Sequence, residues 1–276
     1  MQIALNGATT MRADLETDIR AASEAGFDCL EIWASKLRTY LESRTTTDLN
    51  DLFATHKITP YSINSIEHIT FRDSIRHQSL LAECEELCRI AEEIHCPYIV
   101  VVPSPLPVGT GRSETIEESS RVLGELGRIA ERHGVGLGFE FLGQPDCSVP
   151  TLELANEIVR KTGMINVGLV IDSFHFYAGG STIESIEAID AERLFIVHIN
   201  DAEDLPREQL EDRHRLYPGL GILPLNEILK ALELIGYDRG VSVEIFRPEY
   251  WDYDPLEVAR AARAAAERVL DARTRI

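Results

Sequence analysis

Short apolar runs separated by longer amphipathic stretches repeat along the whole chain. Each short run is rich in β-branched or aliphatic residues, which is typical of strands, and each longer stretch has apolar residues at helical spacing. Such an alternation predicts βα units that build a parallel sheet. The eight expected strands cover residues 2–6, 29–33, 60–64, 98–103, 136–142, 167–172, 195–200 and 241–246.

The stretches between these strands carry the polar starts and glycine ends that are typical of helices. Gly26, Gly134, Gly163 and Gly236 each follow an amphipathic stretch, where a left-handed residue commonly ends a helix. Ser113 and Thr151 supply polar first turns. The expected helices cover residues 14–25, 47–56, 74–95, 113–133, 151–162, 181–189, 226–235 and 255–273.

Eight strands alternating with eight helices in 276 residues predict a single (β/α)8 TIM-barrel domain over residues 1–276. A doubly wound sheet is the second choice, but residues 6–10 after the first strand do not have the G-x-G-x-x-G spacing of a phosphate-binding loop. No change of composition and no flexible linker marks a second domain. Residues 201–223, after the seventh strand, are expected to form an elaborated loop.

The composition is that of a globular, acidic protein. The chain has 27 basic and 46 acidic residues, a net charge of −19, and 44% hydrophobic residues. The negative charge disfavours a nucleic-acid partner, which clustered basic residues would bind. We expect a cytoplasmic protein without a membrane partner, because no secretory signal and no apolar run of about 20 residues occurs. The five cysteines are expected to be reduced and buried.

Ionisable residues stand near the carboxyl ends of four consecutive predicted strands: Glu140, Asp172, His198 and Glu244. These strand ends meet at the mouth of a barrel, where its active site lies. A single carboxylate at a strand end is more often a helix cap or part of an ion pair than a ligand, and a single histidine is as often a core residue. Four ionisable residues at the same depth on adjacent strands instead indicate that they bind one ion together. Three carboxylates and an imidazole suit one divalent metal ion, such as Mn²⁺, Zn²⁺, Co²⁺ or Mg²⁺.

Several segments around these residues carry a resemblance to a known family. They are GFEFLG (residues 138–143), VIDSFHF (170–176), VHIND (197–201) and SVEIFRPEY (242–250). With them, the chain resembles the xylose-isomerase-like sugar (phosphate) isomerase/epimerase superfamily over nearly its whole length. The likeness is greatest to the branch that acts on 2-keto-myo-inositol in inositol catabolism.

The resemblance implies roles for individual residues. Glu140, Asp172, His198 and Glu244 would bind one divalent metal ion, and Glu140 and Glu244 would also transfer protons. His175, three residues after Asp172, matches a substrate-facing histidine of the superfamily. Arg215, in RLYPG (residues 215–219), matches its substrate-binding arginine. The other two substrate-binding candidates, expected on the rim of the barrel, are Arg247 and Glu31, for which surface ion pairing is an equal alternative.

The implied activity is a metal-dependent isomerisation of a keto-polyol or ketose through a cis-enediolate, without an organic cofactor. One alternative is a dehydratase or lyase that acts on a keto-polyol or a 3-keto-glycoside. A nuclease is opposed by the charge of −19 and the modest number of histidines. A non-catalytic sugar-binding barrel is disfavoured by the paired Glu140 and Glu244. The alanine-rich helix at residues 255–273 could face a second copy of the chain, so a homo-oligomer stays open.

Overall fold

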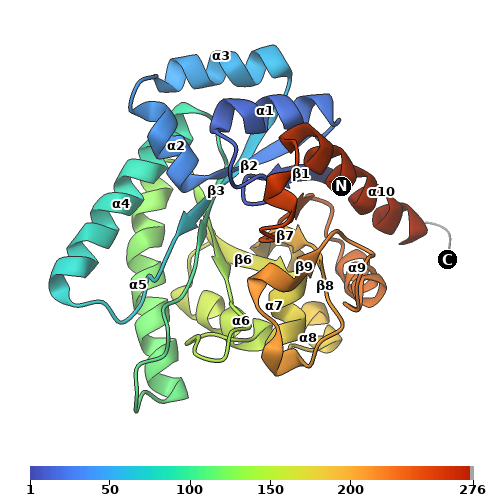
Figure 1. Cartoon of the computed structure of the whole chain (residues 1–276). Coiled ribbons are helices and arrows are strands. Elements are labelled where there is room, and N and C mark those ends of the chain that lie inside the picture. The colour runs from blue at the N-terminus through green and yellow to red at the C-terminus, as the bar shows by residue number, and fades with distance from the viewer. Residues whose placement is uncertain (274–276) are drawn as a thin grey trace.

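The computed structural model describes residues 1–273, in which eight parallel strands form a closed barrel surrounded by helices (Figure 1). Seven strands follow each other around the barrel in chain order, and β10 pairs with both β7 and β1 to close it. The predicted barrel is therefore confirmed. The strands are β1 (Gln2–Asn6), β2 (Cys29–Trp33), β3 (Thr59–Ile66), β4 (Tyr98–Val101), β5 (Gly136–Glu140), β6 (Val167–Asp172), β7 (Leu194–Ile199) and β10 (Gly240–Val243).

All eight predicted helices are present, with ends that differ by a few residues, and two short helices were not predicted. Gly163 ends α6 in the left-handed conformation with φ of 68°, as the sequence indicates. The unpredicted helices, α2 and α7, directly follow β2 and β6. The helices are α1 (Leu15–Glu24), α2 (Ala34–Leu41), α3 (Thr46–His56), α4 (Ser74–Glu93), α5 (Arg112–Arg132), α6 (Leu152–Thr162), α7 (Ser173–Ala178), α8 (Ile183–Glu187), α9 (Leu225–Leu234) and α10 (Pro255–Arg273).

The segment after β7, expected as a loop, is built around a small antiparallel hairpin. Strand β8 (Asp201–Ala202) pairs with β9 (Arg215–Leu216). The buried carboxylate of Asp201 accepts hydrogen bonds from the backbone amides of Gly219 at 3.0 Å and Leu223 at 2.9 Å. These bonds tie β8 to the segment that follows β9, and Arg215, the first residue of β9, contacts Asp172 at the end of β6.

The barrel separates two apolar cores. A large core lies between the strands and the helices, and a small one fills the barrel interior around Ala4, Cys29 and Val170. At the amino-terminal end of the barrel, interior glycines make room for aromatic rings: a β-carbon on Gly240 would lie 2.9 Å from the Tyr61 ring. Aromatic and aliphatic side chains thus fill the lower half of the barrel, and the polar interior positions lie above them.

Two further expectations concern the thiols and the helices. All five cysteines are buried and free, and the Cys84 and Cys88 sulfurs lie 3.8 Å apart on α4, consistent with the structural role expected of them. Within residues 1–273, no helix combines the length and the apolar character that a membrane span requires.

The hydrogen bonds of Tyr61 allow a test of how the lower half of the barrel contributes to the stability of the protein. Its hydroxyl accepts a hydrogen bond from the Gly240 amide at 3.1 Å and lies 3.2 Å from the Phe195 and Gly240 carbonyl oxygens. Tyr61→Phe leaves that buried amide without its partner, so we expect the free energy of unfolding to fall by about 1–3 kcal/mol. Urea denaturation measures the change, and an unchanged unfolding midpoint would contradict this account.

Candidate metal centre

The four strand-end residues predicted from the sequence meet at the mouth of the barrel. Glu140 ends β5, Asp172 ends β6, His198 lies on β7 and Glu244 directly follows β10. All four are buried, and one ligand atom from each lies within 4.8 Å of the others. The Nδ1 atom of His198 is 2.9 Å from Glu140 Oε1, 3.3 Å from Glu244 Oε2 and 4.0 Å from Asp172 Oδ2.

Fixed donors orient two of the three carboxylates. The Asn200 amide donates to Asp172 Oδ2 at 2.8 Å, and the backbone amide of His175 donates to Asp172 Oδ1 at 2.8 Å. Asp172 therefore also caps α7, which begins at the next residue. The side-chain amides of Asn6 and Asn64 donate to Glu244 Oε1 at 3.0 and 2.8 Å.

Arg215 crosses the site as a buried cation. Its Nη1 donates to Asp172 Oδ2 at 2.7 Å and to Glu244 Oε2 at 3.0 Å, and its Nη2 donates to Asp212 at 2.9 Å and to His175 Nε2 at 3.1 Å. Because Nε2 of His175 accepts this bond, its proton lies on Nδ1. Within residues 1–273 that buried Nδ1 has no hydrogen-bond partner.

Burial and charge together set the pKa values of the site. Burial, reinforced by Glu244 and Asp172, raises the pKa of Glu140 to about 7 although His198 opposes the shift. Burial also disfavours ionised Asp172, but Arg215 and the two histidines outweigh it and lower the pKa of Asp172 to about 2. Burial opposes protonation of His198, yet the surrounding carboxylates raise the pKa of His198 well above its ordinary value.

The donor set fits a divalent cation. Three carboxylates and one imidazole nitrogen converge in a buried space, where like charges repel strongly unless cations balance them. Arg215 and a protonated His198 balance only part of this charge, because the carboxylates of Glu31 and Asp212 adjoin the same cluster. A site of this kind is able to hold a metal ion with mixed nitrogen and oxygen preference.

The two residues expected on the rim have different positions. The expected rim position of Glu31 is wrong: its side chain is fully buried inside the barrel, and both carboxylate oxygens lie 3.1 Å from His198 Nε2. Arg247 is on the rim and is half-buried, but it pairs with Glu203 at 2.7 Å and lies over the Tyr250 ring. Surface ion pairing, the alternative considered for both, therefore applies to Arg247.

Four polar residues that the sequence analysis did not select contact this centre: Asn6, Asn64, Asn200 and Asp212. Three of them are asparagines at or near the carboxyl ends of strands. The sequence analysis selected only ionisable residues at these ends, and a search that included side-chain amides would also have found the three asparagines. Asp212 lies in the segment expected as a loop, and no periodic signal marks it.

A cavity of about 310 Å³ opens above the centre. Glu140, Glu244, His175 and Arg215 line its base, and the rings of Trp33 and Phe246, packed edge to face at 5.6 Å, supply an apolar wall. Most of the remaining lining side chains are polar and could hydrogen-bond the hydroxyls of a polyol, whereas Val102 and Leu142 are apolar. The remaining lining residues are Asn64, Ser65, Glu67, His68, Val102, Leu142, Gln144 and Asp212.

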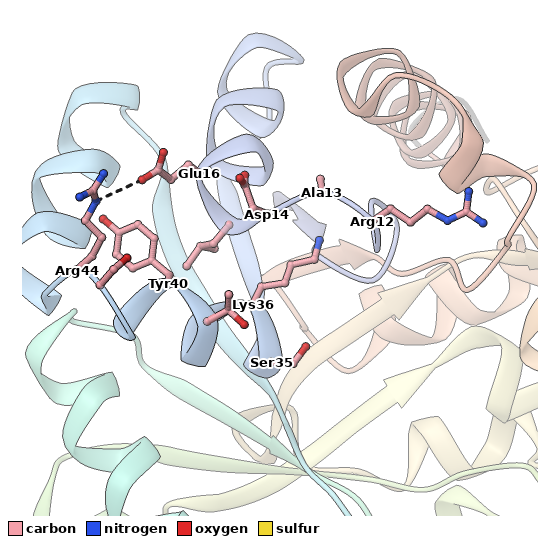
Figure 2. Close-up of a pocket in the computed structure, with 11 residues that line it drawn as sticks. Arg12, Ala13, Asp14, Glu16, Ser35, Lys36, Tyr40 and Arg44 are labelled. Atoms are coloured by element: carbon pink, nitrogen blue, oxygen red, sulfur yellow. Dashed lines mark ion pairs between the residues drawn. The ribbon is translucent and has the colours of Figure 1, made fainter.

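A larger cavity of about 440 Å³ lies beside α1 and α2 and does not contain the candidate ligands (Figure 2). Its basic side chains already have carboxylate partners: Arg12 pairs with Asp252, Lys36 with Asp18 and Arg44 with Glu16. Size alone therefore does not identify the reactive site, and the smaller cavity has the convergent ionisable groups.

Comparisons with known proteins agree with this geometry. Residues 19–270 match the family model of the xylose isomerase-like TIM barrel. The chain is 38% identical to the inosose isomerase of Bacillus velezensis over 98% of this chain and 97% of that protein. It is 38% identical to the inosose isomerase of Bacillus subtilis over 95% of each. The crystal structure of the IOLI protein with a zinc atom superposes with a TM-score of 0.96 at 37% identity, covering 100% of both chains.

Zinc should stabilise the folded protein through these four residues. A metal ion at about 100 times its dissociation constant adds about 2.7 kcal/mol to the free energy of unfolding, which raises the melting temperature of a chain this size by about 5–10 °C. Asp172→Ala should lose most of that shift, whereas Tyr61→Phe, at the other end of the barrel, should keep it. Thermal denaturation with and without Zn²⁺ measures both, and an equal shift in Asp172→Ala would refute the ligand assignment.

Proposed function

Since this chain belongs to the xylose isomerase-like TIM barrel family, we propose that it is a metal-dependent isomerase whose substrate is 2-keto-myo-inositol, an inosose. The observation that carries the proposal is the buried convergence of Glu140, Asp172, His198 and Glu244 beneath a cavity lined by both polar and apolar side chains. The match to two inosose isomerases over nearly their whole length supports this choice of substrate. The reaction belongs to inositol catabolism.

Moving a carbonyl to the neighbouring carbon requires removal of a weakly acidic proton. In the proposed site, Glu140, Asp172, His198 and Glu244 hold one divalent metal ion. When bound, this ion supplies Lewis-acid polarisation of the substrate carbonyl, which makes the adjacent C–H more acidic. No organic cofactor is required, because the reaction only relocates protons and an electron pair within the substrate.

Glu140 and Glu244 are the proposed acid–base pair. One carboxylate takes the proton from the hydroxyl-bearing carbon, which gives an enediolate, and a proton is then returned to the former carbonyl carbon. Both carboxylates line the cavity, from strands on opposite sides of His198, so they can flank a bound polyol. The hydroxyl proton passes to the new hydroxyl oxygen, and the overall reaction is neutral in protons and electrons.

Arg215 and His175 are the proposed orienting residues. Arg215 already contacts Asp172 and Glu244, so a substrate oxygen that lies against its guanidinium is held beside the proposed base. The unpartnered Nδ1–H of His175 supplies a donor to a second hydroxyl. For Arg247 and Glu31, the substrate-binding role expected from the sequence is not retained, because neither lines the cavity.

The same centre would serve a dehydratase or lyase that acts on a keto-polyol, because elimination of a β-hydroxyl begins with the same proton abstraction. The two chemistries differ in the fate of the enediolate and not in its formation. We place the protein in the cytoplasm, with a small polyol as its partner and without a nucleic-acid partner, which the net charge of −19 disfavours.

The substrate can be tested with the zinc- or manganese-loaded protein and 2-keto-myo-inositol in D₂O. Isomerisation should give new proton NMR signals of a second inosose, with deuterium at the carbon next to the carbonyl. An ultraviolet-absorbing conjugated ketone would instead indicate elimination of water and would move the protein to the dehydratase branch. Absence of product and of exchange would refute the substrate assignment.

Glu140→Gln tests the acid–base role. The amide keeps the size of the side chain but cannot take a proton, so turnover should fall by about 10²- to 10⁴-fold. Within residues 1–273 the side chain of Glu140 accepts one hydrogen bond, from His198, so the fold should survive the substitution. Deuterium exchange per unit of correctly folded protein measures the effect, and a rate close to that of the unaltered protein would refute the role.

A further inference from the structure

We infer that Glu31 is a positioning residue that determines which ring nitrogen of His198 faces the metal ion. This inference rests on the proposed function, because it assumes that His198 is a metal ligand. Glu31 lies on β2, which is separated from β10 by one strand, β1. It contacts Nε2 of His198, whereas the other candidate ligands lie near Nδ1 of the same ring.

The geometry separates the two nitrogens of the His198 ring. Nδ1 faces Glu140 and Glu244 at 2.9 and 3.3 Å, whereas Nε2 faces both oxygens of Glu31 at 3.1 Å. A nitrogen that binds a cation must offer a lone pair, so in the metal-bound ring the proton lies on the other nitrogen. Glu31 accepts that proton's hydrogen bond. The arrangement leaves Nδ1 as the ligand atom.

The surroundings of Glu31 keep the carboxylate in place. The residue is fully buried, and the side-chain amide of Asn64 donates to Glu31 at 3.1 Å and to Glu244 at 2.8 Å. The Asn64 amide therefore links Glu31, on the Nε2 side of His198, to the candidate ligand Glu244, on its Nδ1 side. A carboxylate that hydrogen-bonds a ligand histidine fixes the ring and makes its free nitrogen a better donor to the metal.

An alternative is that Glu31 only stabilises the barrel. The two roles differ in what its removal changes: a structural residue alters the free energy of unfolding, and a positioning residue alters the affinity and the electronic environment of the metal ion. Tyr61→Phe is the matched control, because it perturbs a buried hydrogen bond of the same barrel without touching the four ligands.

Glu31→Gln keeps the shape of the side chain and removes its charge. We expect the affinity for Zn²⁺, measured by competition with a chromophoric chelator, to fall about 10- to 100-fold. With Co²⁺ as the probe, the visible absorption bands should shift in Glu31→Gln and stay unchanged in Tyr61→Phe. Affinity and spectrum equal to those of the unaltered protein would overturn the inference.

A measurement on the unaltered protein covers the case in which Glu31→Gln does not fold. In the zinc-loaded protein, ¹⁵N NMR of the imidazole should show His198 with a protonated Nε2 and a metal-bound Nδ1. A metal-bound Nε2 would overturn the inference while leaving the proposed metal centre in place. Absence of zinc binding by the unaltered protein would instead overturn the proposed function itself.

Discussion

The accumulation of carboxylates at the barrel mouth is the constraint on which the rest of this structure depends. Glu31, Glu140, Asp172 and Glu244 are all buried around one imidazole, and Arg215 is the buried guanidinium among them. Removing such groups from water is costly unless each charge is paired or hydrogen-bonded. The asparagines, the hairpin and the first turn of α7 each supply donors to this cluster. The local structure at the mouth is therefore organised by its charges.

The two halves of the barrel have separate tasks. The lower half is apolar, with glycines opposite aromatic rings, and it provides close packing that keeps the strands in register. The upper half replaces this packing with polar side chains on the same strands, since alternate residues of every strand point inward. Because the same strands carry both sets of residues, the packing of the lower half fixes where the candidate ligands lie. Fixed positions of this kind are needed to bind a small cation.

Local patterns were sufficient to predict the barrel, its strands and the four candidate ligands, because each strand is an apolar run and four consecutive strands carry an ionisable residue at or near their carboxyl ends. The expectation that Glu31 lies on the rim was wrong for a physical reason. In β2, Leu30 and Ile32 face the helices, so strict alternation directs Glu31 into the barrel even though it stands close to the strand end. The hairpin of β8 and β9 could not be predicted, because two-residue strands have no periodicity. Its position depends on the bonds of Arg215 to Asp172 and Glu244, which lie far from it in the sequence.

The two proposed acid–base residues differ in how firmly the protein alone holds them. Both oxygens of Glu244 are engaged, Oε1 by Asn6 and Asn64 and Oε2 by Arg215. Glu140 accepts a single hydrogen bond within residues 1–273, from His198, and it borders the cavity. Before a metal ion binds, the protein therefore holds Glu244 in one orientation and constrains Glu140 less. A bound ion would fix Glu140 as well, because Glu140 is one of the four proposed ligands, so Glu244 is the member of the acid–base pair that the protein orients in advance.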